Sequence, residues 1–435
     1  MPPQSEQGET ILGHVAGLRH APGISVSAAV RAALSQRADL THKPNLRAGR
    51  HGWLRLTPAY SVRIVTDLIA REDRPLRVFD PFCGTATTAL SAAAHGHEAV
   101  TLDINPFLVW LGRAKTAHYS VETLAAAKDA GRQARALAER EAVAPAPAPP
   151  LHNVGRWWTP PALAFLCRLR AAIDTVTPPR SPERDLLLVA FCRTLIALSS
   201  AAFNHQSLSF KDAGSPPPDP DFGAIFAADL RFVLDGAAEN PPGRAAVLLG
   251  DARHPAASVT GLFDRVITSP PYANRMSYIR ELRPYMYWLG FLKTGRDAGE
   301  LDWAAIGGTW GIATSRLGQW QRPAESFRPA WLDDVLDQIA TRGHKSSHLL
   351  AAYVGRYADD MWQHFRALPA LLAPGATVHY IIGNSTFYGV LLPTERLYAE
   401  MLAALGFTDV SYRPIRKRNS KQALLEFDVS ARWPG

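Results

Sequence analysis

The amino-acid sequence predicts an α/β fold in which parallel strands form an open sheet with helices packed against it. Short apolar runs alternate with helical patterns, and two of these runs, 76–79 and 263–267, lead directly into proline-containing turns. Open α/β sheets build their ligand sites at the carboxyl ends of their strands. Both turns are therefore expected at one edge of a single sheet.

The first βαβ unit is predicted within residues 61–103. Its elements, in order, are a helix over 61–69, a strand over 76–79, a helix over 87–95 and a strand over 98–102. This order implies two parallel strands joined by a helical crossover. Before the unit, Thr57 and Pro58 predict a helix start, with Thr57 as the cap and Pro58 at the first helical position.

Changes in composition mark segments inserted into the sheet. Alternating Ala and Pro over 144–150 predict an extended linker, and 157–235 has a mainly helical pattern that a Pro-rich stretch at 214–220 interrupts. Residues from about 293 to 347 are rich in Trp, Gly and Arg. Their weak periodicity indicates a second insertion that faces a ligand or, on composition alone, a disordered loop.

Strand patterns return in the second half of the chain, at 245–249, 263–267, 377–382, 408–413 and 423–429. The first of these leads to Asp251. Helical patterns over 350–372 and 397–405 separate the later strands, and the last two strands predict a closing β-hairpin.

Composition bounds the class of protein and its compartment. The chain has 435 residues, 47% of them hydrophobic, which is enough for a large core with inserted units. Its net charge is +8 and its basic residues are mostly Arg, which suits a polyanionic partner, although charge alone does not select one. No apolar run reaches about 18 residues and the polar start lacks a signal-peptide pattern, so we expect a cytoplasmic protein.

Cysteine usage supports neither a disulfide framework nor a zinc site. The three cysteines, Cys83, Cys167 and Cys192, are odd in number, and no two are spaced as Cys-x-x-Cys. We expect all three to be buried, reduced thiols, and we predict no metal.

The first proline-containing turn, DPFCGTATT at 80–88, has the properties of a cofactor site. A strand, a glycine-containing turn and a helix bring backbone N–H groups towards a ligand, and Asp103 at the next strand end can accept hydrogen bonds from two ribose hydroxyls. The dinucleotide fingerprint Gly-x-Gly-x-x-Gly is absent, and an acidic turn suits a ligand with a cationic amino-acid end. S-adenosylmethionine is such a ligand.

This stretch resembles the cofactor motif of the amino-directed DNA methyltransferases, which modify N4 of cytosine or N6 of adenine. The resemblance implies a Rossmann-like methyltransferase sheet, with residues 56–60 similar to the family's cofactor-covering motif. The cofactor-binding residues it implies are Thr57, Pro58, Asp80, Phe82, Gly84, Thr85, Asp103 and Asp251. The chain has Ala86 where the family usually has glycine, and Ala is costly there if the backbone needs a positive φ. Without a ligand, Asp80 would simply cap a helix.

The second turn carries Ser269, Pro270, Pro271 and Tyr272, which suit chemistry on an exocyclic amine. The lone pair of such an amine is delocalised into the base, and hydrogen-bond acceptors can draw its hydrogens out of plane. The prolines stiffen the turn and leave the Pro270 carbonyl and the Ser269 hydroxyl free to accept, while Tyr272 offers a face for stacking. A packed Pro-Pro turn without chemistry is the alternative.

The tetrapeptide resembles that of the N4-cytosine subgroup, so the expected reaction is in-line methyl transfer to cytosine N4 of a base flipped out of double-stranded DNA. A cognate restriction enzyme would be a further partner. Three alternatives stay open: an N6-adenine enzyme, an RNA base methyltransferase and a non-catalytic nucleic-acid-binding relative. Cytosine C5 chemistry is set aside, because none of the cysteines follows a proline as the nucleophile of that family does.

Two groups of basic residues are candidates for DNA contact. Arg275, Arg280 and Arg283 follow the tetrapeptide among aromatic residues, and Arg416 and Arg418 belong to a basic run near the chain end. Packing of the aromatic residues and a solvated charged edge are the alternatives. The polar stretch 204–209 is most simply a surface loop.

These patterns divide the chain into six segments: a helical extension (1–45), the cofactor half of the methyltransferase domain (46–120), a mainly helical insertion (121–243), the catalytic part (244–290), a second insertion (291–349) and the C-terminal part (350–435). The largest insertion lies between Asp103 and Asp251, which departs from the common order of the family. We expect the two insertions to share sequence recognition.

Overall fold

A computed structural model describes residues 34–47, 49–56, 59–70, 72–202, 209–210, 220–274, 277–308, 312–418 and 424–435. Several predictions fall outside these ranges. They concern the helical stretches before residue 34, the cofactor-covering residues Thr57 and Pro58, the polar stretch 204–208 and Arg275.

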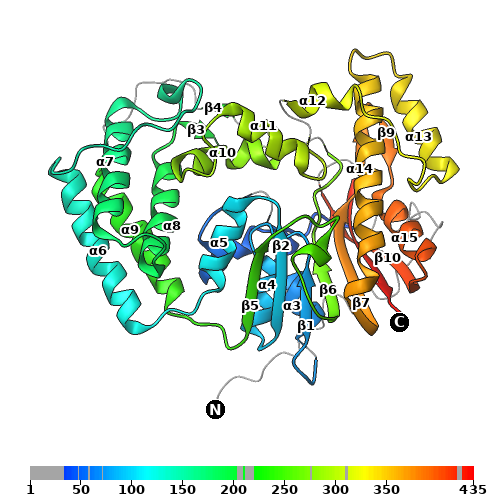
Figure 1. Ribbon diagram of the computed structural model, residues 1–435, viewed down its shortest axis with the longest axis horizontal. Helices are drawn as coiled ribbons and strands as arrows, with labels where there is room; N and C mark the ends of the chain where they lie inside the picture. Colours follow the sequence, from blue (N-terminus) through cyan, green and yellow to red (C-terminus); the bar gives the residue numbers. More distant parts are fainter. Residues whose placement is uncertain are drawn as a thin grey trace.

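A seven-stranded sheet lies at the centre of the molecule, in the order β10-β11-β7-β6-β1-β2-β5 (Figure 1). Its strands are β1 (Arg77–Asp80), β2 (Glu98–Asp103), β5 (Arg244–Leu249), β6 (Phe263–Thr268), β7 (Leu372–Gly383), β10 (Thr408–Lys417) and β11 (Leu425–Arg432). The first five are parallel, and β11 runs antiparallel to both β7 and β10. The predicted Rossmann-like sheet with a closing hairpin is confirmed.

Alternation along the strands divides the core between the two faces of the sheet. Val78 and Ile267 pack with α3 (Val62–Ile69) and α4 (Thr87–Ala94), whereas their chain neighbours Phe79 and Val266 pack on the opposite side. That opposite side is covered by α14 (Ser347–Ala367) and α15 (Thr394–Ala404). Helix α5 (Pro106–Thr116) packs beside β5. Because strand side chains alternate between faces, each buried strand must be apolar on both.

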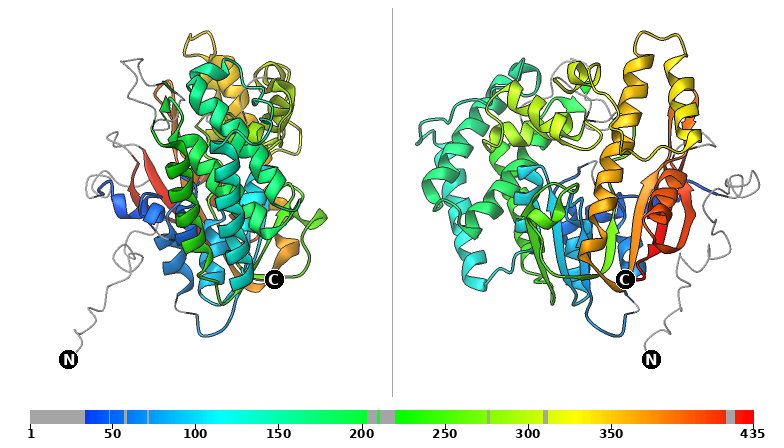
Figure 2. Two further views of the ribbon diagram at one scale, coloured as in Figure 1. Left: turned by 90° about the vertical axis from the view of Figure 1, so that its left-hand side faces the viewer. Right: turned by 45° about the vertical axis from the view of Figure 1, so that its right-hand side comes forward.

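A group of helices stands beside the β5 edge of the sheet (Figures 1 and 2). Its members are α6 (Val121–Glu139), α7 (Pro160–Val176), α8 (Pro182–Ala197) and α9 (Phe222–Ala237). Residues 144–150 before α7 are neither helix nor strand. The group joins α10 (Tyr278–Trp288) through Trp288, which makes edge contacts with Trp158 and Phe191 at centroid distances of 5.6 and 5.4 Å.

The second insertion is helical in the part that the structure describes, so the disordered-loop alternative is wrong there. It contains α11 (Gly295–Ala304), α12 (Ile312–Leu317) and α13 (Ala330–Ala340). Thr294 and Asp297 form a reciprocal capping box at the start of α11, a local signal that overrides the weak periodicity. Leu332 and Ile339 of α13 pack into the core that α14 also enters.

Short elements complete the described fold: β3 (Ala201–Ala202), β4 (Ser209–Phe210), β8 (Ser385–Phe387), β9 (Val390–Leu392), and the 3-10 turns η2 (Ala38–Leu40), η3 (Pro44–Arg47), η4 (Gly49–Gly52), η5 (Val154–Arg156), η6 (Pro255–Ala257) and η7 (Pro369–Leu371). The cysteines Cys83, Cys167 and Cys192 are buried and free, as predicted. Among the described helices, none is both long and apolar enough to cross a membrane.

Candidate functional site

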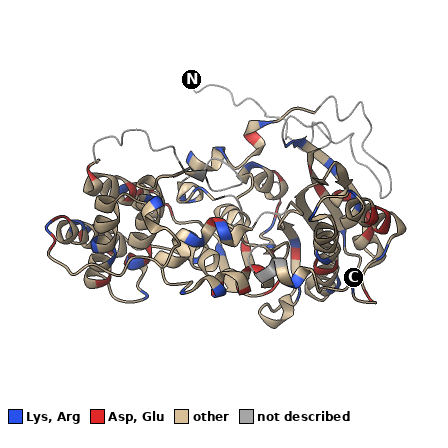
Figure 3. Ribbon diagram, turned by 90° about the horizontal axis from the view of Figure 1, so that it is seen from above, with Lys and Arg blue, Asp and Glu red and all other residues tan. Residues whose placement is uncertain are grey.

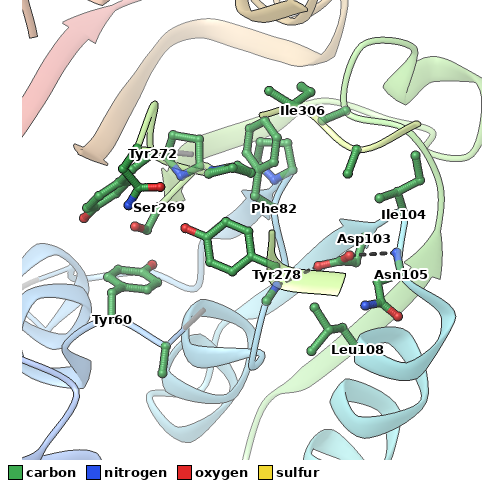
Figure 4. A pocket seen from close by; sticks show the side chains of 18 of the residues that line it. Tyr60, Phe82, Asp103, Ile104, Asn105, Leu108, Ser269, Tyr272, Tyr278 and Ile306 are labelled. Carbon is green, nitrogen blue, oxygen red and sulfur yellow. Dashed lines mark hydrogen bonds between the residues drawn. The ribbon is translucent and has the colours of Figure 1, made fainter. Parts of the chain in front are cut away.

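A cavity of about 310 Å³ lies at the carboxyl ends of β1, β2, β5 and β6 (Figure 4). Residues of both proline-containing turns line it. In Figure 4, Ser269 and Tyr272 lie on one side, Asp103 and Leu108 lie on the other, and Phe82 is between them. The predicted site residues that line the cavity are Phe82, Gly84, Asp103, Asp251, Ser269, Pro270, Pro271, Tyr272, Arg416 and Arg418.

Asp80 lies behind the cavity wall and joins the two turns. Its carboxylate accepts hydrogen bonds from the Thr268 hydroxyl (2.6 Å) and from the Phe82 N–H (3.0 Å), and only 1% of its surface is exposed. Burial raises the pKa of Asp80 to about 6, despite these hydrogen bonds. Asp80 therefore holds the first turn against the strand that leads to the second.

The first turn is held open towards the cavity by its backbone. The Cys83 N–H donates to the Leu102 carbonyl (2.7 Å), and the Gly84 N–H donates to the Asp103 carboxylate (2.9 Å). Ala86 has φ of 61°, so this alanine does adopt the left-handed conformation that glycine prefers. Thr85 faces inward, and its carbonyl accepts from the buried ammonium of Lys115 (3.1 Å).

Asp103 presents a carboxylate to the cavity. It accepts hydrogen bonds from the backbone N–H groups of Gly84 and Asn105, the latter at 2.8 Å. Burial nevertheless raises the pKa of Asp103 to about 7, because two amide donors do not replace the water lost by an ionised carboxylate. At neutral pH the Asp103 carboxyl is therefore close to half ionised when it meets a hydroxyl donor in the cavity.

Asp251 also lines the cavity, but its carboxylate is largely occupied by Arg253. The Arg253 guanidinium donates to both oxygens, at 2.7 to 3.1 Å, and also to Asp360 and the Ala304 carbonyl, each at 2.7 Å. Burial opposes ionisation of Asp251, but the Arg253 hydrogen bonds and charge hold its pKa below the ordinary value. Sequence reasoning missed Arg253, although it stands only two residues after the acid.

In the second turn, the observed hydrogen bonds leave two oxygen atoms able to accept a further hydrogen bond. The Ser269 hydroxyl donates to the Ile381 carbonyl (2.9 Å), which leaves its oxygen lone pairs to accept. The Tyr357 hydroxyl donates to the Pro271 carbonyl (2.9 Å) and is itself paired with the Tyr398 hydroxyl. Among the described residues, no donor reaches the Pro270 carbonyl, so it remains a second acceptor beside Ser269.

Tyr272 is fixed by the C-terminal hairpin. Its hydroxyl donates to Glu426 (2.9 Å), and the Arg418 guanidinium lies over its ring at 4.9 Å from the centroid. Arg416 holds Glu426 with two hydrogen bonds, at 2.7 and 3.0 Å. Burial and the Glu426 charge raise the pKa of Tyr272 well above its ordinary value, so the hydroxyl stays a donor.

The basic residues that the sequence singles out therefore differ in their surroundings. Arg416 and Arg418 already have partners inside the protein, since Arg418 also donates to the Asn384 carbonyl (2.6 Å). Arg280 is exposed on α10 and lies outside the cavity lining. Arg283 is half-buried over the Trp157 ring, at 5.5 Å from its centroid. Of these four, only Arg280 has the exposed side chain that a phosphate contact needs.

Comparisons with known proteins give limited similarity. No family model matches the chain. The Type II methyltransferase M.BsoBI of Geobacillus stearothermophilus is 28% identical in an alignment of 181 residues that covers 37% of this chain and 35% of that protein. The chain thus matches about a third of that relative's length. Among solved structures, the rRNA methyltransferase aviRa of Streptomyces viridochromogenes aligns over 95% of this chain and 96% of its own, at 12% identity and a TM-score of 0.29.

His364 supports the cavity wall from behind and was not anticipated from the sequence. Its Nδ1 bonds the Ala252 carbonyl (2.7 Å), which requires a proton there, so Nε2 of the neutral ring accepts from the Tyr380 hydroxyl (2.6 Å). Its ring also makes an edge contact with Phe82, at a centroid distance of 5.1 Å. Burial lowers the pKa of His364 to about 4, so the neutral ring persists in the folded protein.

We expect His364 to make stability depend on pH. Below about pH 6.5 the unfolded chain binds a proton at His364, whereas the folded protein does not until about pH 4, so stability is lost as pH falls through this window. The stability advantage of the wild type over His364→Gln should shrink by about 3 kcal/mol between pH 7 and pH 4. Urea unfolding of both proteins at several pH values measures this difference, and a gap that is constant with pH would contradict it.

Proposed function

We propose that this protein is an S-adenosylmethionine-dependent DNA methyltransferase that modifies an exocyclic amine, with N4 of cytosine favoured. One observation carries the proposal: Phe82, Gly84 and Asp103 of the cofactor-like turn line the same cavity as Ser269 and Tyr272. The partial similarity to a Type II methyltransferase supports the reaction class. The preference for DNA and for cytosine rests on the resemblance of the Ser-Pro-Pro-Tyr sequence.

The residues present fit the proposed cofactor. Asp103 would accept hydrogen bonds from the ribose hydroxyls of the cofactor, and the apolar side chains of Ile104 and Leu108 would border its adenine. The family resemblance implies that Asp251 contacts the edge of the adenine. The buried carboxylate of Asp80 behind the first turn suits a cationic amino-acid end in the cavity, whose charge would in turn favour the ionised form of Asp80. When bound, S-adenosylmethionine supplies an electrophilic methyl group on a sulfonium centre.

The second turn would prepare the amine for attack. Ser269 and Pro270 offer oxygen acceptors to its two hydrogens, which draws the nitrogen lone pair out of conjugation with the ring. Tyr272 would support the base by stacking, which is worth about 1 to 3 kcal/mol per base. This offsets part of the few kcal/mol needed to flip a base out of the helix. Tyr357 and Glu426 hold these groups in place from behind.

Nucleoside analysis tests the proposal directly. DNA and RNA of mixed sequence are incubated separately with the protein and methyl-labelled S-adenosylmethionine, digested to nucleosides and examined by mass spectrometry. Labelled N4-methylcytosine from DNA is the expected product. Label in N6-methyladenine of DNA would retain the reaction and correct the base, whereas label only in RNA, or none at all, would contradict the proposal.

We expect the two turns to separate transfer from cofactor binding. Ser269→Ala removes an acceptor at the amine and should lower kcat by about 10² or more, a loss typical of a transition-state hydrogen bond. Tyr272→Ala should abolish transfer, because the base loses its stacking surface. Calorimetry should show nearly unchanged S-adenosylmethionine affinity in both variants.

Tyr272→Phe provides the matched control for these substitutions. It keeps the ring but removes the hydroxyl that Glu426 anchors, so activity should fall between that of the wild type and that of Tyr272→Ala. Near-normal transfer by both Ser269→Ala and Tyr272→Ala would exclude the assigned roles.

Cofactor affinity should depend on pH through Asp103. Its pKa is about 7 in the free protein, and the ionised carboxylate is the better acceptor for ribose hydroxyls. Affinity should therefore weaken about fivefold between pH 7 and pH 6 and approach about tenfold per pH unit below that. Asp103→Asn should bind more weakly at high pH and lose most of this dependence. Calorimetric titrations between pH 5.5 and 8.5 measure it, and the same slope in Asp103→Asn would refute the assignment to Asp103.

A further inference from the structure

The segment before α3 carries basic residues whose side chains divide into two groups. Arg50 is 4% exposed and donates to the Gly236 carbonyl at 2.9 Å, so it supports the fold. Arg37 pairs with Asp39, which also pairs with Arg63 of α3. Lys43, Arg47 and Arg55, in contrast, are exposed, and no acid among the described residues forms an ion pair with them.

Two of these three exposed cations, Lys43 and Arg55, lie beside the cavity. Thr41 and His42 line the cavity, and Lys43 follows them directly. Burial and the charges of Arg55, Arg416 and Lys43 lower the pKa of His42, so these cations lie within electrostatic range of the cavity wall. Because Arg416 is bound to Glu426, Lys43 and Arg55 are the cations of this group that face solvent.

The segment is fixed in position at both ends. The Ser35 carbonyl accepts from the Lys417 N–H of β10 at 2.9 Å, which attaches the segment to the hairpin that holds Tyr272. The Asn45 side chain donates to the Tyr60 carbonyl (2.7 Å) and accepts from the Val62 N–H (3.1 Å). Tyr60 also lines the cavity. Lys43 lies between these two anchors and therefore keeps a defined place relative to Tyr60 and Tyr272, while Arg55 is flanked by the buried side chains of Leu54 and Leu56.

Net charge does not identify this surface. Lys and Arg are spread over all parts of the described fold rather than gathered in one stripe (Figure 3). What distinguishes Lys43 and Arg55 is their position next to a cavity that would hold a base, together with the absence of acidic partners in the described chain. A nucleotide whose base lies in the cavity carries a phosphate on each side.

We propose that Lys43 and Arg55 bind the DNA phosphates that flank the flipped nucleotide. This inference rests on the proposed function. It assigns phosphate contact to the segment before α3, whereas Arg416 and Arg418 position Glu426 and Tyr272 from within the protein. Arg suits phosphate through its planar donors and Lys through its compact charge.

The salt dependence of DNA binding tests the inference. The logarithm of the association constant falls linearly with the logarithm of salt concentration, with a slope of about 0.9 per neutralised phosphate. Lys43→Gln with Arg55→Gln should therefore make the slope shallower by nearly 2 and weaken binding. Fluorescence anisotropy of a labelled DNA duplex carrying a mismatched cytosine, over a series of salt concentrations, measures this change.

A control variant removes two positive charges near the amino ends of the strands, at the end of the sheet opposite the cavity. Arg74 and Arg244 are exposed near the amino ends of β1 and β5, away from the cavity. Arg74→Gln with Arg244→Gln should leave the slope within about 0.5 of the wild-type value. Equal slopes for the wild type and the Lys43/Arg55 variant, equal losses in both variants, or a wild type that does not bind DNA would overturn the inference.

Failure of the reaction and failure of the surface give different results. If DNA binds with the expected change in slope but no nucleoside is methylated, the surface is retained and the proposed activity falls. If DNA is methylated and the slope is unchanged, the activity is retained and the phosphate contacts belong elsewhere. Matching thermal unfolding of wild type and variants confirms that the substitutions do not act through stability.

Discussion

The hydrogen bond between Asp80 and Thr268 is the contact on which the site depends. It joins residues that are 188 positions apart, and it does so between β1 and β6, which pair as neighbours in the sheet. The two turns that follow these strands therefore emerge side by side, whatever the intervening chain does. The entropic cost of closing a loop grows only with the logarithm of its length, so a long insertion between the strands is tolerated.

The second constraint comes from the chain end. Glu426 on β11 holds the Tyr272 hydroxyl, and Arg416 on β10 neutralises Glu426, with side-chain exposures of only 14% and 7% for the Arg and Glu of this pair. A pair this buried gains little net stability, but removing one member strands the other charge. The closing hairpin is thus more than an edge of the sheet, because it determines where the Tyr272 ring can lie.

Sequence reasoning predicted the elements that follow from local pattern. The strands before both turns and the closing hairpin are near their expected positions, and Ala86 has the positive φ that its place in the turn suggested. These features follow from apolar runs and turn residues, which act within a few positions of the chain. It missed partners that the fold brings from afar. Glu426 alternates with apolar neighbours on β11 and so resembles a solvent-facing residue, yet it is 5% exposed, since the cavity wall and Arg416 cover it. Arg418 lies in a basic run and so resembles a surface residue, yet it contacts the Asn384 carbonyl and the Tyr272 ring.

The second insertion is attached to the cavity by polar contacts of Arg253. Arg253 binds Asp251 on the predicted cofactor side, and the same guanidinium reaches Asp360 on α14 and the Ala304 carbonyl at the end of α11. Ala304 itself lines the cavity, so the second insertion forms part of the cavity wall. The Ser277 hydroxyl at the start of α10 also donates to Asp302 of α11. The Arg253 guanidinium resists displacement of α11, because a shift would remove the Ala304 carbonyl and leave one of its N–H groups without that acceptor. The two sides of the cavity are therefore mechanically linked through Arg253, and the second insertion can vary in its outer helices only while the segment at Ala304 stays in place.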